Sequence, residues 1–247
     1  MGLILKQTLE EEKYLEVKMP NGPLQSDLPL LRAYNSTASA NHRLDLRLYP
    51  EPFAGSAAAK VYLLGGNPGW SESDYPLMTS NQPVWDSMMQ HSYNPIPSII
   101  HGPTMYWLDP YWKGLIKPVG SYYGGFTWWE VITNHLRNVE KIQDLHLKLF
   151  NIDYHPYHSQ NIKIDTSINN LPSKSLVDEI IKDAFKDDER LFVILRCRKA
   201  WEDRLMSILG VSKLPFNVIY LKNPRHVSLT PGNMDPADWS RFVDALK

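Results

Sequence analysis

The stretch KVYLLGGNPGW, residues 60–70, decides the fold: a short apolar run ends abruptly in two glycines, an asparagine, a proline and a further glycine. A continuous apolar run bounded by glycines is typical of a strand covered on both faces, as in a parallel sheet. The glycines permit backbone angles that other residues avoid, and Pro68 fixes its own φ, so the loop is expected to hold Asn67 in one position. Ligands of open α/β sheets bind outside the carboxyl ends of the strands, where this loop would lie. The alternative is an ordinary turn after a strand.

The composition is that of a globular protein without a strong charge. The chain has 247 residues, is 43% hydrophobic and carries a formal net charge of −1, so its overall charge gives no reason to bind nucleic acid or a membrane surface. The single cysteine, Cys197, excludes an intrachain disulfide and a four-cysteine zinc or iron–sulfur site. The sequence has neither a signal-peptide pattern nor an apolar run of about 18 residues. We therefore expect a soluble, cytoplasmic protein that is not held in a membrane.

One domain is expected over residues 1–247. Residues 1–59 show little periodicity beyond a candidate helix around Gln7 to Val17, which indicates an N-terminal segment wrapped around the domain. Residues 71–126 are rich in Tyr, Trp, Pro and Gly and lack long periodic runs, so they are interpreted as an aromatic insertion. Long irregular segments in compact domains tend to be lids or binding loops, and a separate small core is the alternative.

The remainder of the chain alternates strands with helices. Strands are predicted near residues 60–65, 146–152, 191–196 and 216–222. Helices are predicted from a capping box at Thr127 and Glu130 to about Asn138, after Ser173 or Ser175, around Trp201 with a stop at Gly210, and after the cap Asp235 with Pro236. Such alternation implies right-handed crossovers. The predicted fold class is therefore α/β, a three-layer α/β/α sandwich with a mainly parallel four-stranded central sheet.

Three short motifs at the ends of these strands carry a resemblance to a known family. The loop Gly65-Gly66-Asn67-Pro68-Gly69 resembles the first motif of the uracil-DNA glycosylase superfamily, in the form found in the mismatch-specific and thymine DNA glycosylases. Asn223-Pro224 is similar to the start of the second motif of that branch, and Leu149-Phe150-Asn151 to the strand end that supplies a uracil-reading Asn in other branches. The lead-in Pro50–Gly55 is similar to that of uncharacterised bacterial members.

The resemblance implies a uracil-DNA glycosylase-like fold and a hydrolase of DNA repair that flips a base out of the duplex and cleaves its N-glycosidic bond. It implies no cofactor and no metal, with DNA or a nucleotide as partner. Asn67 would be catalytic. The residues expected to bind substrate, from these motifs and from the polar groups beside them, are Gly65, Gly66, Pro68, Gly69, Trp70, Asn151, Tyr154, His155, His158, Asn223, Arg225 and His226. The chain departs from the family at Arg225, which replaces the Ser of the second motif.

The chemistry of these side chains can also be considered on its own. Hydrolysis of an N-glycosidic bond passes through an oxocarbenium-like sugar, so the protein must hold a water and stabilise charge on the departing base. The amide oxygen of Asn67 can orient a water, and Asn151 offers one acceptor and two donors to the edge of a pyrimidine. Gly69 stands where uracil-specific members of the family carry a Tyr, which leaves room for 5-substituted pyrimidines. Arg225 is expected to contact phosphate or to fill the vacated stack, with a surface salt bridge as the alternative.

Two other classes of function remain open. Asp153, His155 and His158 could bind zinc with one further histidine, His91, His101 or His226, as in a metal hydrolase. Against this, Pro156 separates the two histidines and denies them a regular helix. The same fold could instead be a non-catalytic module that binds a nucleotide, a nucleic acid or a protein partner through the aromatic insertion.

Overall fold

The core of the molecule is a mostly parallel β-sheet. The computed structural model describes residues 23–48, 50–69, 105–116, 124–161 and 163–247. Within them the strand order is β1-β3-β2-β4-β5, with β1 antiparallel to β3 and the other neighbours parallel. The strands are β1 Phe53–Gly55, β2 Val61–Gly65, β3 Leu149–Asp153, β4 Leu191–Ile194 and β5 Val218–Tyr220. The prediction of an α/β protein with a mainly parallel sheet is confirmed.

The predicted number of four strands is wrong, because β1 adds a fifth strand at one edge. Ala54 of β1 is paired with Asn151 of β3. The strand has only three residues, too few for its sequence to show an alternating pattern. Gly55 has a φ of 113°, and a Cβ built on it would overlap the carbonyl oxygen of Leu149, so this close approach requires glycine. Part of the segment expected to wrap around the domain therefore belongs to the sheet.

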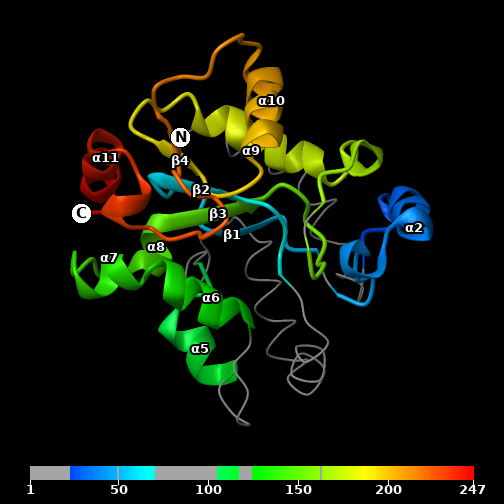
Figure 1. The fold of residues 1–247 in the computed structure, drawn as a ribbon, viewed down its shortest axis with the longest axis horizontal. Helices are drawn as coiled ribbons and strands as arrows, with labels where there is room; N and C mark the ends of the chain where they lie inside the picture. The colour runs from blue at the N-terminus through cyan, green and yellow to red at the C-terminus, as the bar shows by residue number, and fades with distance from the viewer. Residues whose placement is uncertain (1–22, 49, 70–104, 117–123, 162) are drawn as a thin grey trace, which may run out of the picture.

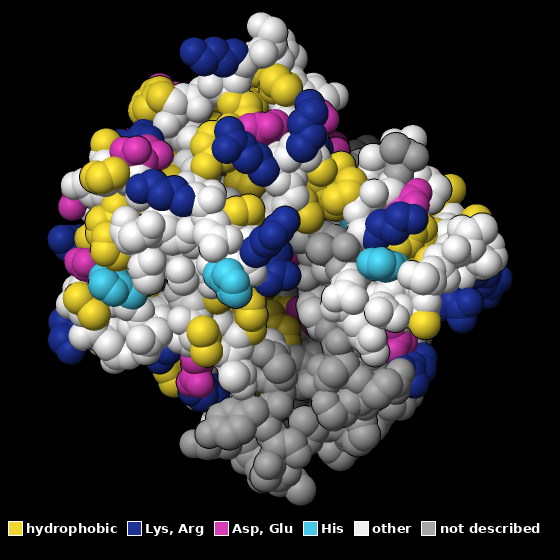
Figure 2. Space-filling model, in the orientation of Figure 1, with side chains coloured by type: hydrophobic (Ala, Val, Ile, Leu, Met, Phe, Trp, Pro, Cys, Tyr) yellow, Lys and Arg dark blue, Asp and Glu magenta, His cyan; other side chains and the backbone are white. Residues whose placement is uncertain are grey.

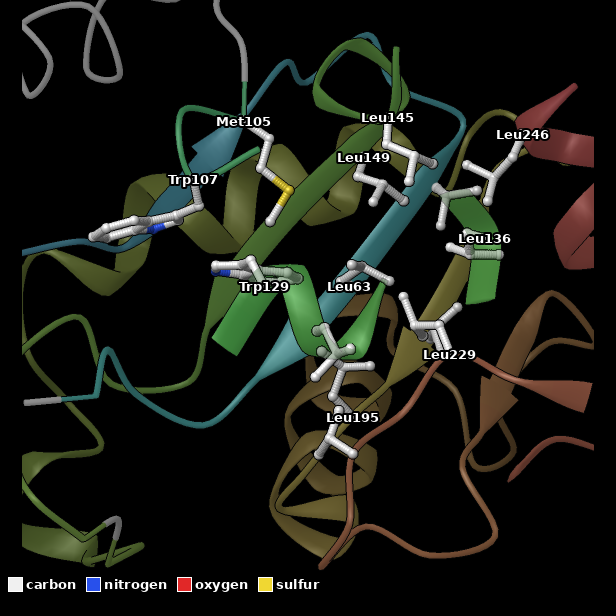
Figure 3. Close-up of a cluster of buried hydrophobic side chains, with 14 of the residues drawn as sticks. Leu63, Met105, Trp107, Trp129, Leu136, Leu145, Leu149, Leu195, Leu229 and Leu246 are labelled. Carbon is white, nitrogen blue, oxygen red and sulfur yellow. The ribbon is translucent and has the colours of Figure 1, made fainter. Parts of the chain in front are cut away.

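Helices cover both faces of the sheet (Figure 1). On one face lie α9 Lys174–Ala184 and α10 Arg198–Leu209, whose Val177, Ile181, Trp201 and Leu205 pack against Tyr62, Leu64, Phe150 and Phe192. On the other face lie α6 Gly124–Ile132, α7 Asn134–Asn138 and α11 Pro236–Leu246. Figure 3 shows this second core, in which Leu63, Leu149 and Leu195 meet Trp129, Leu136 and Leu246. Burial on both faces explains why these strands are continuous apolar runs.

The remaining elements extend these two layers. They are α2 Leu28–Thr37, η1 Ala40–His42, α5 Pro110–Ile116, α8 Leu145–Lys148, η2 Thr166–Ile168 and η3 Pro231–Asn233. A third cluster joins α2 to the region after β3 through Leu31, Tyr34, Tyr157 and Ile168. The Tyr157 hydroxyl donates a hydrogen bond of 2.7 Å to the buried carboxylate of Asp27, which fixes the start of α2 to this region.

Several predicted element ends differ from the structure. The predicted helix over 127–138 is two helices, α6 and α7, and Thr127 lies inside α6 instead of capping it. The helices are separated at Thr133, whose hydroxyl and backbone N–H both donate to the carbonyl of Trp129, at 2.6 and 3.1 Å. The predicted strand over 146–152 begins only at Leu149, because α8 occupies the residues before it.

Two predicted helix ends are confirmed by their backbone geometry. Gly210 follows α10 with a φ of 66°, the left-handed conformation that ends many helices. Asp235 caps α11 by accepting a hydrogen bond from the Ala237 backbone N–H at 3.3 Å. Both signals come from short-range chemistry, which is why the sequence alone predicts them well.

The described part of the aromatic insertion packs into the main core. Tyr106, Trp107, Trp112 and Phe126 are all buried against the face of the sheet that α6 covers, whereas Tyr111 is about half exposed. The rest of the insertion, like the candidate helix around Gln7 to Val17, lies outside the described residues. Among the helices that are described, none is both long and apolar enough to cross a membrane.

Candidate functional site

The candidate site lies at the carboxyl edge of the parallel strands. The chain runs from β2 to β3 on one side of β2 and then to β4 on its other side, so β2 and β4 form the point where the strand order reverses. Ligands of doubly wound sheets bind at such a point. The loop Gly65–Gly69 follows β2 there. The indole of Trp201 fixes its start by donating to the Gly65 carbonyl at 2.6 Å.

Asp153 is the titratable group at the centre of this edge. It ends β3, is paired with Gly65 in the sheet register, and accepts a hydrogen bond of 3.0 Å from the Asn151 amide. A Cβ built on Gly65 would overlap the Asp153 carboxylate, so glycine makes the space that this side chain occupies. Burial, followed by the nearby charge of Glu51, raises the pKa of Asp153 to about 7, although Asn151, His158 and Arg196 act in the opposite direction. A carboxyl group with this pKa can exchange protons at neutral pH.

A buried ion pair lies beside Asp153. His158 Nε2 is 3.0 Å from Glu51 Oε1, and both side chains are at most 5% exposed. The Tyr106 hydroxyl donates to the other oxygen of Glu51 at 2.5 Å. His158 Nδ1 lies 3.2 Å from the Gly69 carbonyl. Burial lowers the pKa of His158, but the Glu51 carboxylate and the Gly69 carbonyl outweigh it, so the net shift is upward.

Because both ring nitrogens of His158 face oxygen atoms, the doubly protonated imidazolium fits the site best. The charged ring then connects the segment before β1 with the loop after β2.

Asn67 is held by its amide nitrogen. Its Nδ2 donates to the Ser159 hydroxyl at 2.9 Å and to the Pro68 carbonyl at 3.0 Å. Gly69 and Ser159 also form an isolated parallel bridge. The amide oxygen of Asn67 accepts no hydrogen bond from the residues that the structure describes, so it is available to a water or a ligand. Gly69 is exposed, and a Cβ built there would have no described atom within 4 Å, which agrees with the open space expected at this position.

The side chains of Tyr154 and His155 lie in a basic environment, and the His155 backbone N–H donates to the Gly66 carbonyl at 2.9 Å. Tyr154 belongs to the core under α9 and α10, and Lys174 Nζ lies 4.3 Å from its ring centroid. Burial, with repulsion from Lys174 and Arg204, lowers the pKa of His155 to about 2. Neither of its buried ring nitrogens has a hydrogen-bond partner in the part of the chain that the structure describes. Burial and Arg204 likewise lower the pKa of Lys174 to about 7.

An open surface pocket of about 580 Å³ lies next to Tyr154. Its other lining residues are Ile164, Asn169, Cys197, Arg198, Lys199, Ala200 and Asp203. The two basic side chains of its lining are already paired with carboxylates one helical turn away, Arg198 with Glu202 and Lys199 with Asp203. Glu51, Asp153 and His158 do not line this pocket, although Cys197 of its lining, whose thiol pKa is raised mainly by burial, is near enough to Asp153 for that carboxylate to raise it further.

The second predicted motif is at the same edge of the sheet but is exposed. Asn223, Arg225 and His226 follow β5, which is parallel to β2 and separated from it by β4. Their hydrogen bonds are local, since Asn233 accepts from the Asn223 N–H at 2.7 Å and donates to the His226 carbonyl at 3.2 Å. Trp70 lies outside the described residues. The structure thus brings the loop after β2 together with Asn151 and His158, whereas the motif after β5 stands apart from them.

Glu51, Asp153 and Arg196 were not among the predicted site residues. Asp153 was considered only as a zinc ligand, and Glu51 only as part of a lead-in. The signal for Arg196 was present, because it follows the apolar run of β4 as Asn67 follows that of β2. Glu51 had no comparable signal, since its role depends on a contact with a residue more than a hundred positions away.

In the described part of the chain, no group of three or more His, Cys, Asp or Glu side chains is arranged to hold a metal ion. His155 and His158, the proposed zinc pair, have different surroundings, because His158 is engaged by Glu51 and His155 faces Lys174 and Arg204. His91 and His101 lie outside the described residues. Comparison with family models, with curated proteins and with solved structures finds no match for this chain.

Proposed function

We propose that this protein hydrolyses the N-glycosidic bond of uracil or of a related damaged or mismatched base. The observation that carries the proposal is the Asp153 carboxyl group, with a pKa of about 7, held by Asn151 at the edge of the sheet that Asn67 also occupies. The helices on both faces of the sheet and the resemblance of Gly65–Gly69 to the first glycosylase motif support it. Without these motifs the same carboxyl group would indicate only general acid and base chemistry.

In the proposed reaction a water molecule attacks C1′ of the sugar. Its proton passes to the Asp153 carboxylate, the C1′–N bond breaks, and the bonding electrons leave with the base, which then takes up a proton. The amide oxygen of Asn67 orients the water. The imidazolium of His158 places a positive charge near the departing base and fixes the Gly69 carbonyl.

The partner that this proposal implies is a nucleotide or a short stretch of nucleic acid. On the face shown in Figure 2, Lys and Arg side chains are interspersed with Asp and Glu side chains, and no broad surface of one sign is seen there. The formal net charge of −1 agrees with this. Affinity for the phosphate backbone would therefore come from a few local contacts.

The test is single-turnover release of uracil from a uracil-containing oligonucleotide and from deoxyuridine monophosphate. Asp153→Asn should lower the rate about 100- to 10,000-fold, since it removes the proton acceptor. Asn67→Ala should lower it about 100- to 1000-fold. The matched control Asp203→Asn, in an exposed ion pair on α10, should keep the wild-type rate. Because the carboxylate is the active form, the wild-type rate should rise with pH up to about pH 7 and then level off.

The results distinguish a glycosylase from a binding module and from a metal hydrolase. Full activity of both variants would overturn the assigned roles of Asp153 and Asn67. If the wild-type protein releases no base but binds nucleotide or DNA, the molecule is a binding module. Loss of activity on chelation, with recovery on adding zinc, would instead favour the metal hydrolase.

A further inference from the structure

Arg196 lies beside the candidate site on the opposite side of β2 from Asp153. Leu195 continues the ladder beyond β4, with its N–H donating to the Leu64 carbonyl at 2.9 Å, so Arg196 comes next to the two glycines that end β2. Asp153 is paired with Gly65 from the other neighbouring strand. The guanidinium is close enough to lower the pKa of Asp153. An acidic and a basic group thus flank the carboxyl end of β2.

The guanidinium of Arg196 has no anionic partner among the described residues. Its Nε is buried and finds no hydrogen-bond acceptor. Its central carbon lies 5.8 Å from the ring centroid of Trp128, on α6. Four other arginines are paired with carboxylates: Arg190 with Asp187, Arg198 with Glu202, Arg204 with Asp178 and Arg241 with Asp238. The Nε of Arg137 is also buried without a described acceptor, but its guanidinium donates to the Glu130 carbonyl. A buried donor without a partner is unfavourable, so this side chain is suited to an acceptor that comes with a ligand.

The chemistry of the side chain indicates which ligand. A guanidinium presents its donors in a planar fork that matches the oxygens of a phosphate or a carboxylate, and Trp128 restricts that fork. The proposed reaction acts on the sugar of a nucleotide, and the anionic group of that sugar is its phosphate. The ligand must also enter at the carboxyl edge, where Arg196 lies.

We propose that Arg196, held against Trp128, binds the phosphate on the sugar whose glycosidic bond is cleaved. The proposal rests on the proposed function and deepens it, since it makes a phosphorylated sugar unit, and not a free nucleoside, the substrate class. The phosphate could belong to a mononucleotide or to a strand of nucleic acid. In both cases the same contact forms between the guanidinium and the phosphate oxygens.

A titration that needs no particular base tests this site. The probe is 2-deoxyribose 5-phosphate, with 2-deoxyribose as the unphosphorylated control, and the readout is the NMR signal of the Arg196 Nε–H group together with that of the Trp128 indole. Both signals should shift with the sugar phosphate and not with the sugar. A short single-stranded oligonucleotide forms a second arm. A shift in the first arm alone indicates a mononucleotide substrate, and a shift in both arms indicates a strand.

Variants connect the signal to Arg196. Arg196→Gln should weaken binding of the sugar phosphate about tenfold or more, the typical effect of losing hydrogen bonds to a charged group. Arg196→Lys, which keeps the charge but loses the fork, should fall between this variant and the wild type. Arg198→Gln, an exposed arginine two residues later, is the matched control and should bind as the wild type does.

The two proposals fail in distinguishable ways. If the wild-type protein gives no shift in either arm, or if Arg196→Gln binds sugar phosphate as well as the wild type, the phosphate site is wrong even when uracil is released. If the phosphate-dependent shift is present and is lost in Arg196→Gln but no base is ever released, the phosphate site stands and the proposed hydrolysis fails.

Discussion

His155 and His158 are three residues apart and almost equally buried, yet their surroundings give them opposite properties. His158 lies against Glu51 and near Asp153, and its pKa is raised. His155 lies near Lys174 and Arg204, and its pKa is lowered to about 2. Burial acts in the same direction on both rings, so the sign of the neighbouring charge decides the difference. The raised pKa of His158 therefore marks an acidic side of the site, with Glu51 and Asp153. The lowered pKa of His155 marks a basic side, with Lys174 and Arg204.

The acidic side, around Glu51 and His158, is held by an ion pair and hydrogen bonds, and the basic side, around His155 and Lys174, has fewer such contacts. Glu51 connects to Tyr106 and His158, and His158 connects to Gly69. On the basic side, both ring nitrogens of His155 lack a hydrogen-bond partner among the described residues, and the ammonium of Lys174 lies on the Tyr154 ring and forms no ion pair with a described carboxylate. We infer that the acidic side holds the loop after β2 in place. On the basic side, the buried positive charges repel one another and lower the stability of the fold.

The largest effect on stability is expected when the Glu51–His158 ion pair is removed. Glu51→Gln removes the carboxylate and leaves a buried imidazolium without its partner, which should cost about 3 kcal/mol of unfolding free energy. The same substitution at Glu189, which pairs with Lys60 on the surface, should cost about 0–1 kcal/mol. Chemical denaturation of both variants at pH 6 measures the difference, and NMR should show a lowered pKa of His158 in the first variant. Equal losses in the two variants would contradict a stabilising role for the buried pair.

An intermediate effect of opposite sign is expected on the basic side. The pKa of Lys174 is lowered to about 7, so between pH 7 and about 10.5 the unfolded chain binds more protons than the folded one, and stability rises with pH. Lys174→Met should therefore stabilise the protein by about 1–2 kcal/mol at pH 6, since it removes a buried charge but also a cation–π contact. The gain should shrink at pH 9.

The control for this prediction is Lys182→Met, an exposed lysine on the same helix, α9. Thermal unfolding should show no comparable gain for it at either pH. A loss of stability in Lys174→Met at pH 6 would mean that the contact with Tyr154 outweighs the burial of the charge.

The sequence predicted the parts of the molecule that depend on short-range patterns. The apolar runs of β2 and β4 and the stop at Gly210 all follow from residues close together in the chain. The sequence also indicated that polar groups would gather where the strands end. It could not predict β1, because three residues show no period and the strand exists only through its pairing with β3.

The candidate site was predicted only in part, because some of its contacts join segments that are far apart in the chain. Asn67 was recognised because it follows an apolar run, and Asn151 because Leu149–Asn151 resembles a family motif. The Glu51–His158 pair joins distant segments, and its existence cannot be inferred from either residue alone. The different roles of His155 and His158 likewise depend on charges brought by other elements, so their spacing suggested a shared metal site that their surroundings do not support.

The smallest effect at neutral pH is expected at the unpartnered histidine. His155→Leu replaces a neutral ring by an apolar side chain, so the lost packing and the removed cost of two unpaired ring nitrogens should nearly cancel, within about 1 kcal/mol at pH 7. Below pH about 6.5, His155 binds a proton in the unfolded chain but not in the folded chain, because its pKa is lowered on folding. The free energy of unfolding of the wild type therefore falls as the pH is lowered, and His155→Leu lacks this contribution. His158→Leu should show the reverse dependence, with its deficit greatest at low pH, because the raised pKa of His158 adds stability there. Unfolding curves of both variants from pH 5 to pH 8 measure this, and two parallel curves would show that the charges around the two rings do not differ as the structure indicates.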